Sequence, residues 1–315
     1  MYLDNIRINS KTENEVNNIE NFDNWVKQEI MIGSGKGKKV WLINPKNPDK
    51  QGWFKYVKKT LRKNPDGSYS ECNSYENFSE KLAELIANTI GMKNAHIDLG
   101  IYENEIGCFS YNINKPMEEI VSLITKKYPK YNEKLLYDEQ NKIYYSIQMI
   151  LSSLNNKKLA KDFFKILIFD YIIGNSDRHS NNWAIVRKDK DEFEIGPLYD
   201  NGSSLCAYVY EEDIEKYFQK DKLKMNSLVR TKSKSMIKID EKDKKKPTHL
   251  EVIKYLHKNF YDETNEFVNT VINKLDENKI ENLVEQVNEM SYNRKRLLKK
   301  YLKLKIEDLK EVYGK

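Results

Sequence analysis

Residues 169–205 read FDYIIGNSDRHSNNWAIVRKDKDEFEIGPLYDNGSSL, an apolar segment that runs into eight consecutive polar residues and then into two short strand-like pieces. The polar residues extend from Asn175 to Asn182, directly after Gly174. A buried element that ends in a loop of hydrogen-bonding side chains is a common way to build a functional site, because loops on rigid elements carry chemistry. We therefore interpret this stretch as part of a phosphate-transfer site.

Three side chains in this stretch are of the kinds that phosphoryl transfer requires. Asp177 can orient or deprotonate an attacking hydroxyl, and Asn182 and Asp200 offer oxygen ligands for magnesium. Asp177 and Asn182 are five positions apart, as are the catalytic Asp and the metal-binding Asn of the protein-kinase catalytic loop. That pattern places His and Arg before the Asp, whereas Arg178 and His179 follow it here. Each residue alone would fit ordinary turn and cap chemistry, so the prediction depends on the whole set.

The order N-x-D-R-H-x-x-N, followed by a strand and by Y-D-N-G, resembles the HipA-like serine/threonine kinases of bacteria, particularly their shorter CtkA-like members. The resemblance implies an α+β, protein-kinase-like bilobal fold, with a small antiparallel-sheet N-lobe and a larger, mainly helical C-lobe. It also implies the use of ATP and Mg²⁺, and a protein substrate with a serine or threonine acceptor. Asp177 is then the catalytic residue, and Asn182 and Asp200 hold the metal. Arg178 and His179 would support the loop or the departing charge.

Two alternatives remain open from the sequence. The D-R-H-x-x-N core also resembles phosphoinositide kinases, so the chain could be a lipid or small-molecule kinase. It could also be a kinase-shaped module that binds a nucleotide without transferring phosphate. The second alternative is less favoured, because the three groups that transfer requires are all present.

A glycine-rich segment near the beginning of the chain precedes the strand-like residues 40–43. Backbone N–H groups in such a segment can approach phosphate oxygens. It is neither a Walker A loop nor the full G-x-G-x-x-G of protein kinases, and taken alone it is better explained as a flexible hairpin tip. The resemblance implies that it holds the triphosphate, and that Ser34 is a candidate for autophosphorylation, where a phosphate would clash with ATP. The residues concerned are Gly33, Ser34, Gly35, Lys36 and Gly37.

Residues 51–60, QGWFKYVKKT, predict the strand that follows. Lys55 in this strand shares a face with Trp53. A lysine on an otherwise apolar face either extends its amine to solvent or points at a ligand. The resemblance implies that Lys55 contacts the α- and β-phosphates of ATP. Lys58 and Lys59 are competitors for this role.

Residues 76–90, ENFSEKLAELIANTI, predict a helix, because apolar residues recur at helical spacing and Gly91 supplies a stop. Glu80 and Glu84 are one turn apart, so both could face the same partner. The resemblance implies that Glu80 orients Lys55. Without the resemblance, a solvated salt bridge is an equally good explanation for either glutamate.

The sequence pattern divides the chain into an N-terminal extension at residues 1–30, an N-lobe at 31–115 and a helical C-lobe at 116–315. The resemblance implies that a hinge around residues 114–116 meets the adenine. Paired strands are predicted at 95–102 and 105–113, a hairpin at 183–186 and 193–195, and helices at 116–128, 139–154, 157–173 and from 248 onward.

The composition is that of a soluble globular protein, with 39% hydrophobic and 32% charged residues among 315. No apolar run approaches the length of about 20 residues that a membrane span needs, and the first residues lack the apolar core of a signal peptide. Cys72, Cys108 and Cys206 form no C-x-x-C pair, so neither a disulfide framework nor a zinc site is indicated. A reducing cytoplasm fits best, although secretion into a host is not excluded.

Positive charge is concentrated at the C-terminal end. The formal net charge is +6, and residues 291–315 contain nine Lys or Arg against three Asp or Glu. Such a segment can contact nucleic acid or acidic lipid. Apolar residues at helical spacing favour an amphipathic helix whose charged face is solvated.

A second lysine-rich segment lies within residues 203–248, which are low in apolar content. In kinases the equivalent region governs activation and substrate docking, and the resemblance makes this segment a candidate for either. A mobile, solvated loop is at least as good an explanation from the sequence alone.

Overall fold

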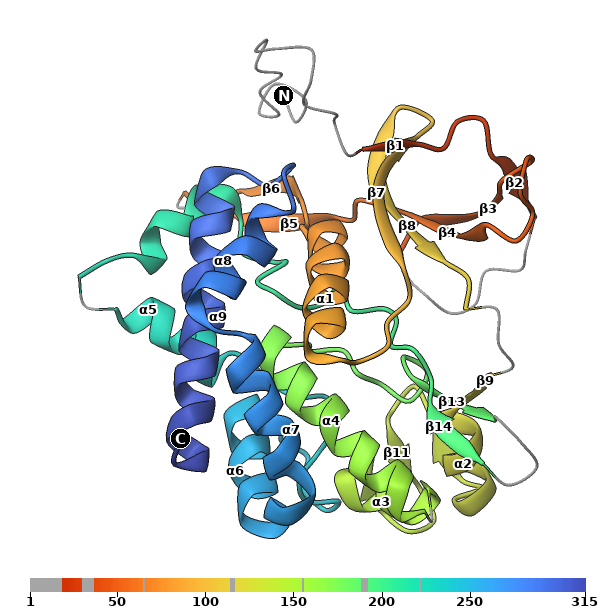
Figure 1. Cartoon of the computed structure of the whole chain (residues 1–315), viewed down its shortest axis with the longest axis vertical. Coiled ribbons are helices and arrows are strands. Elements are labelled where there is room, and N and C mark those ends of the chain that lie inside the picture. Colours follow the sequence, from red (N-terminus) through yellow and green to blue (C-terminus); the bar gives the residue numbers. More distant parts are fainter. Residues whose placement is uncertain are drawn as a thin grey trace.

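The computed structural model has two parts, a curled β-sheet with one long helix beside it and a larger helical part (Figure 1). The α+β, bilobal arrangement predicted from the sequence is therefore confirmed. The predicted boundary between residues 115 and 116 falls outside the described residues and stays a prediction. The structure describes residues 19–29, 37–64, 66–113, 117–154, 156–187, 192–220 and 222–315.

The main sheet has six strands in the order β1-β7-β8-β4-β3-β2, with β1 parallel to β7 and every other pair antiparallel. The β7–β8 hairpin turns at Glu103 and Asn104, whose φ angles of 51° and 60° are those of the tight turns that match strand twist. The strands are β1 Glu20–Asn21, β2 Val26–Gln28, β3 Lys39–Ile43, β4 Gln51–Tyr56, β7 Ile97–Tyr102 and β8 Glu105–Tyr111.

Helix α1, Glu76–Ile90, packs against β7 and β8 on one side and against helices of the helical part on the other. Its predicted bounds are confirmed, and it ends at Gly91, whose φ of 82° is typical of a glycine C-cap. An aromatic cluster on the sheet includes Phe22, Phe54 and Phe109. The sheet is thus packed by α1 and by this cluster, which fixes the strand that carries Lys55.

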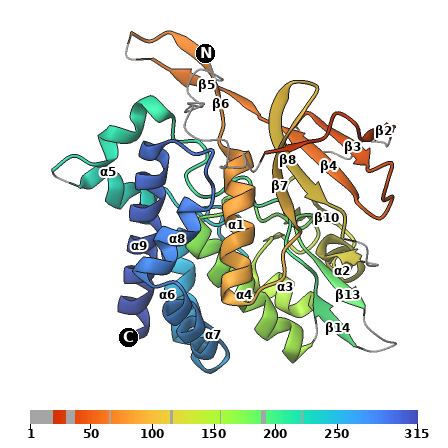
Figure 2. The ribbon, with the colours of Figure 1, turned by 45° about the horizontal axis from the view of Figure 1, so that its top comes forward.

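The predicted strand at 51–60 is two strands. It breaks after Tyr56, and β5, Lys59–Lys63, pairs with β6, Tyr69–Asn73, in a hairpin that projects from the main sheet (Figure 2). The backbone N–H of Ser74 donates to the carbonyl of Lys58, which extends the pairing of β5 and β6 by one residue at the base of the hairpin. The break separates Lys55 from the other candidate lysines.

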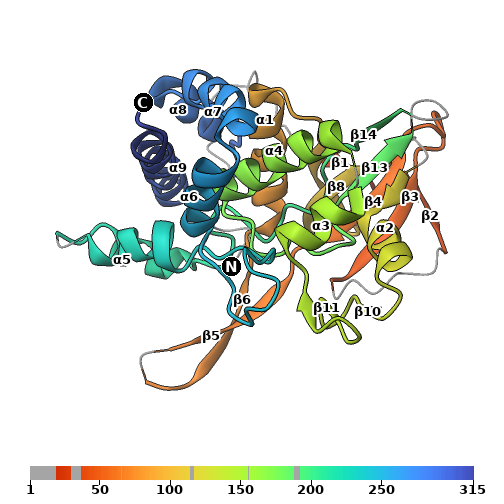
Figure 3. The ribbon, with the colours of Figure 1, turned by 90° about the horizontal axis from the view of Figure 1, so that it is seen from below.

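The helical part is built around α4, Lys157–Ile173, whose predicted bounds are confirmed. Its side chains are buried on most sides, and α3, α6, α7 and α9 pack around it (Figure 3). Among the described residues no helix is long and apolar enough to cross a membrane. The other helices are α2 Ile120–Lys127, α3 Ile147–Leu154, η2 Glu211–Tyr217, α5 Leu223–Asn226, η3 Ser227–Thr231, α6 His249–Asn259, α7 Tyr261–Lys274, α8 Glu277–Glu285 and α9 Tyr292–Tyr313.

Two predicted helices begin later than expected. The one predicted at 139–154 begins at Ile147, because the residues before it form a small sheet of β10 Tyr131–Asn132, β11 Tyr137–Asp138 and β12 Ile143–Tyr144. Aromatic and β-branched residues in this segment favour strands. The one predicted at 116–128 begins at Ile120, since β9 Met117–Glu119 pairs with the predicted hairpin, which is present as β13 Ala184–Arg187 and β14 Phe193–Ile195.

The lysine-rich segment is packed against the helical part, so a loop in solvent does not describe it. Val229 and Ile237 are each 1% exposed. The N–H of Ser235 donates to the carbonyl of Pro247, and the N–H of Lys238 donates to the carbonyl of Tyr145. A few buried apolar side chains and these backbone hydrogen bonds fix the segment against the helical part, although its composition alone predicted little structure.

The basic face of α9 is occupied by ion pairs within the protein. Lys295 and Lys299 both contact Glu285 of α8, at 2.9 and 2.7 Å. Lys303 contacts Glu281 at 2.9 Å. These lysines therefore neutralise acidic residues of the preceding helix.

Candidate active site

A cleft of about 420 Å³ lies between the sheet and the helical part. Residues from both parts line it. Lys58 and His179 are among them, as are five residues that the sequence analysis assigned to ATP binding, metal binding or catalysis. These are Gly37, Lys55, Glu80, Asp177 and Asp200. Residues separated by more than 140 positions thus meet in one cavity.

Lys55 stands at the centre of the cleft. Its Nζ lies 2.6 Å from Oε1 of Glu80 and 2.8 Å from Oδ1 of Asp200. Burial lowers the pKa of Lys55, but the carboxylates of Asp200 and Glu80 outweigh it and hold that pKa well above its ordinary value. The amine is therefore a permanent cation that joins the sheet to the helical part.

Glu80 is 2% exposed and uses both of its carboxylate oxygens. While Oε1 accepts from Lys55, Oε2 accepts from the backbone N–H of Asn201 at 2.9 Å. Helix α1 therefore contacts both the lysine and the loop that carries Asp200, residues 199–202, which we call the Asp200 loop. The pairing of Lys55 with Glu80 expected from the sequence is present, and its role in nucleotide binding stays a prediction.

Asp200 presents a half-exposed carboxylate to the cleft. Its φ of 57° lies in the left-handed region, which Asp tolerates better than most residues. The positive charge of Lys55, together with its hydrogen bond, lowers the pKa of Asp200 to about 2. The carboxylate is therefore ionised at neutral pH.

Asp177 lies in the polar loop at residues 175–182, which we call the Asp177 loop. Its backbone N–H donates to Oδ1 of Asn175 at 3.0 Å, which fixes the loop next to the carboxylate. Burial raises the pKa of Asp177, and the negative charge of Asp200 raises it further, while His179 opposes the shift. The pKa values of Asp177 and Asp200 are thus shifted in opposite directions.

Asn182 is the last residue of the Asp177 loop and is 4% exposed. Its Nδ2 donates to the carbonyl of Asp177 at 2.8 Å, and its backbone N–H donates to the carbonyl of His179 at 3.0 Å. It is not among the residues that line the cleft. The structure therefore places Asn182 directly against Asp177, and its predicted role as a metal ligand is not tested.

Arg178 connects the Asp177 loop to the Asp200 loop on their buried side. Its guanidinium is 1% exposed and donates to the carboxylate of Asp170 in α4, with Nη2 to Oδ1 at 2.8 Å. It also donates to the carbonyl of Asn182 at 2.8 Å and to Oδ1 of Asn201 at 2.6 Å. The sequence left the role of Arg178 open, and these contacts show that it supports the loops. Asp170 was missed, although a carboxylate within the apolar run at residues 163–173 is a signal of a buried partner.

His249 provides a second anchor that the sequence analysis did not assign to the site. Its Nε2 lies 2.9 Å from the carbonyl of Asn175, and its Nδ1 lies 3.0 Å from Oγ of Ser233. Burial, with the nearby charge of Lys305, lowers the pKa of His249 to about 3. A neutral imidazole therefore bonds the Asp177 loop to the residues before α6.

The structure separates the competing lysines. The amine of Lys58 lies 3.4 Å from Glu76, at the edge of the cleft, and Lys59 pairs with Glu71 across the β5–β6 hairpin at 2.9 Å. Neither contacts Glu80. The predicted loop residues Gly33, Ser34, Gly35 and Lys36, and the predicted hinge at 114–116, lie outside the described residues.

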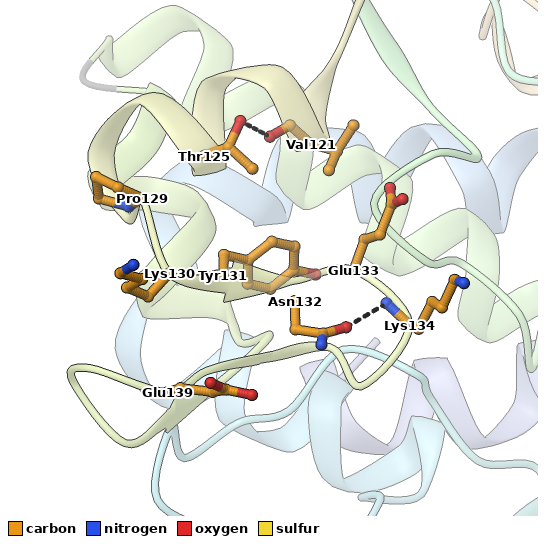
Figure 4. A pocket seen from close by; sticks show the side chains of 9 residues that line it. All are labelled: Val121, Thr125, Pro129, Lys130, Tyr131, Asn132, Glu133, Lys134 and Glu139. Carbon is orange, nitrogen blue, oxygen red and sulfur yellow. Dashed lines mark hydrogen bonds between the residues drawn. The ribbon is translucent and has the colours of Figure 1, made fainter.

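Another hollow, of about 580 Å³, lies between α2 and β10 (Figure 4). It adjoins the end of the Asp177 loop, because Tyr131 donates to Oγ of Ser180 at 3.3 Å and Glu133 accepts from Asn181 at 3.0 Å. None of the predicted site residues lines it. Its residues support the loop from the side.

A small sheet with a lysine–glutamate pair, closed over a helical part that carries two acidic loops, is the arrangement of the protein-kinase-like fold. Within that class, the chain belongs to the family of the HipA-like C-terminal domain, whose sequence profile matches residues 55–293. The family resemblance read from the sequence is therefore confirmed.

One sequence match and two solved structures illustrate the similarity. Over 150 residues the chain is 30% identical to the serine/threonine-protein kinase CtkA of Helicobacter pylori, a match that covers 45% of this chain and 44% of that protein. The crystal structure of the H. pylori proinflammatory kinase CtkA has a TM-score of 0.74 and 20% identity, covering 94% of this chain and 99% of that one. HipA from the HipA–HipB–operator DNA complex of Shewanella oneidensis MR-1 has a TM-score of 0.52 and 11% identity, covering 91% and 68%. The two structures support the fold.

Proposed function

We propose that this chain is an ATP- and Mg²⁺-dependent serine/threonine protein kinase. The observation that carries the proposal is the contact of Lys55 with both Glu80 and Asp200, at 2.6 and 2.8 Å, in the cleft that Asp177 also lines. Kinases use such a lysine to hold the α- and β-phosphates. Membership of the HipA-like family and the partial match to a serine/threonine-protein kinase support the same function.

In the proposed reaction Asp177 accepts the proton of the acceptor hydroxyl. The hydroxyl oxygen forms a bond to the γ-phosphorus of ATP, and the bond from that phosphorus to the β–γ bridging oxygen breaks, so that ADP leaves with the electron pair. A raised pKa makes Asp177 a stronger base than an ordinary aspartate. Lys55 balances the charge of the phosphates, and Arg178 positions both loops without reaching the cleft.

The carboxylate of Asp200 in the cleft fits a magnesium ion. Mg²⁺ usually takes one or two protein carboxylates and completes its shell with water and phosphate oxygens. Asp200, ionised and 52% exposed, would hold the ion, which would neutralise phosphate charge. Asn182 is the predicted second ligand, and it would have to turn toward the cleft, which it does not line in this structure.

The test is transfer of label from γ-labelled ATP to a protein acceptor by the wild type and by Asp177→Asn. We expect the substitution to lower the rate at least about 100-fold, the usual scale for loss of a positioned base. Asp262→Asn, at the exposed start of α7, is the matched control and should leave the rate unchanged. Equal labelling by the wild type and Asp177→Asn would overturn the mechanism.

Two further readouts belong to the same assay. Label in phosphoinositides, with none in protein, would replace the proposal by a lipid kinase. Label in the chain itself that disappears in Ser34→Ala would support the predicted autophosphorylation.

A further inference from the structure

A smaller hollow of about 290 Å³ opens beside the cleft, toward the helical part. Ser203 lines both cavities, and Ser176, which lines the smaller one, precedes Asp177 in the chain. The N–H and the hydroxyl of Ser176 both donate to the carbonyl of Ser203, at 3.1 and 3.2 Å. The two cavities therefore adjoin at Ser203, beside the residue that precedes Asp177.

Two lysines from the lysine-rich segment line the hollow. Lys232 and Lys234 are both exposed, and neither makes a salt bridge within the described parts of the chain. The charge of Lys234 acts weakly on Glu251, whose carboxylate caps α6 by accepting from Thr248. The two amines are thus free to meet a carboxylate from another molecule.

These lysines are held at a fixed position relative to Asp177. The N–H of His249 donates to the carbonyl of Ser233, which lies between them, and the imidazole of His249 contacts the carbonyl of Asn175. Asn175 in turn accepts the N–H of Asp177. A chain of three short contacts therefore links the lysine pair to the proposed base.

The surroundings add more positive charge. Burial raises the pKa of Asp177, and Lys246 and Lys58 both oppose that shift, so each lies close enough for its charge to act on the carboxylate. Residues 242–246 contain four lysines and one aspartate. These lysines make the electrostatic potential beside Asp177 more positive, which favours an anionic partner.

We propose that this hollow is the acceptor-peptide site, and that Lys232 and Lys234 select segments in which acidic residues flank the serine or threonine. The proposal rests on the proposed kinase function and adds the class of its substrate. A peptide is favoured over a lipid headgroup because the hollow and the cleft adjoin at Ser203, so one chain could occupy both. The peptide would carry its hydroxyl to Asp177 and its carboxylates to the two lysines.

The experiment compares three peptides with the same central serine and with Asp/Glu, Asn/Gln or Lys/Arg flanks. We measure kcat/KM for each peptide with the wild type, with Lys232→Glu/Lys234→Glu, and with Lys254→Glu/Lys258→Glu. The last variant makes the same change in net charge on the exposed face of α6 and is the matched control. Anisotropy of a fluorescent acidic peptide measures binding without any transfer.

We expect the wild type to prefer the acidic over the neutral peptide by about tenfold, the scale of one or two favourable charge contacts. The Lys232→Glu/Lys234→Glu variant should lose that preference and favour the basic peptide, while the control keeps the wild-type order. Equal use of the acidic and neutral peptides by the wild type, or equal effects of the two double variants, would overturn the proposal. So would competition by phosphatidylinositol phosphate vesicles that exceeds competition by the acidic peptide.

The binding measurement separates this proposal from the kinase proposal. If the wild type labels no peptide but binds the acidic one through Lys232 and Lys234, the transfer function fails and the acidic-peptide site stands. If it labels peptides without regard to charge, the transfer function stands and the site fails. Absence of both labelling and binding rejects both.

Discussion

Nη2 of Arg178 donates to Oδ1 of Asp170 across 2.8 Å, and both side chains are almost completely buried, at 1% and 3% exposure. Asp170 belongs to the central helix α4, whereas Arg178 belongs to the Asp177 loop. The same guanidinium reaches Asn201 in the Asp200 loop. The buried guanidinium of Arg178 therefore sets the spacing between the loop that carries Asp177 and the loop that carries Asp200.

Replacing Arg178 with methionine should destabilise the protein strongly. The substitution leaves the carboxylate of Asp170 buried without its partner, which typically costs about 3–5 kcal/mol. The free energy of unfolding, measured with urea, checks this value. Lys161→Met removes an exposed ion pair with Glu266 and is the control, with an expected loss below about 1 kcal/mol. Similar losses of unfolding free energy for the two variants would contradict the conclusion that Arg178 is a main structural support of the two loops.

Replacing Lys55 with methionine should abolish most activity while the chain stays folded. The change removes the only group that contacts Glu80 and Asp200 together within the described residues. Loss of a positioned charge in a reaction site commonly lowers the rate about 100-fold or more. Lys59→Met, on the projecting hairpin, is the matched control and should keep wild-type kcat/KM. A Lys55→Met variant with normal activity would remove the proposed phosphate contact.

The parts of the fold that were predictable depend on local signals. Helix α1 and helix α4 both end at a glycine, Gly91 and Gly174, and both show the apolar spacing of a packed helix. The hairpin around Asn104 was visible from a polar turn between apolar runs. Lys55 and Glu80 were found through the family pattern, because a lysine on a strand and a glutamate on a helix are common by themselves.

The parts that were not predictable depend on distant contacts. Arg178 contacts Asn201 only because α4 and the hairpin bring the two loops together, which no local pattern encodes. The bonds of His249 to Asn175 and Ser233 likewise join segments far apart in sequence. The segment around Ile237 has too few apolar residues to predict a packed structure, and backbone bonds supply what composition does not.

Replacing Gly174 with alanine should cost much more than the same change at Gly91. Both glycines have positive φ, at 67° and 82°. A Cβ at Gly174 would lie 2.1 Å from the hydroxyl of Tyr301, whereas a Cβ at Gly91 would have open space around it. We expect a loss of about 1 kcal/mol at Gly91 from backbone strain, and at least about 1–3 kcal/mol more at Gly174 from overpacking. Urea unfolding measures both, and Tyr301→Phe should recover part of the difference.

The buried amine of Lys305 should make the protein more stable as pH rises above neutrality. Lys305 is fully buried and donates to Oγ of Ser233 at 2.9 Å. Burial lowers its pKa to about 7, although Asp308 opposes this. Between pH 7 and 10 the unfolded chain therefore binds a proton that the folded chain does not, so the free energy of unfolding gains up to about 1.4 kcal/mol per pH unit from this group. Lys305→Met should be more stable than the wild type at pH 7.5, with an advantage that shrinks toward pH 9. Parallel urea-unfolding curves for the two proteins across this range would contradict the assignment.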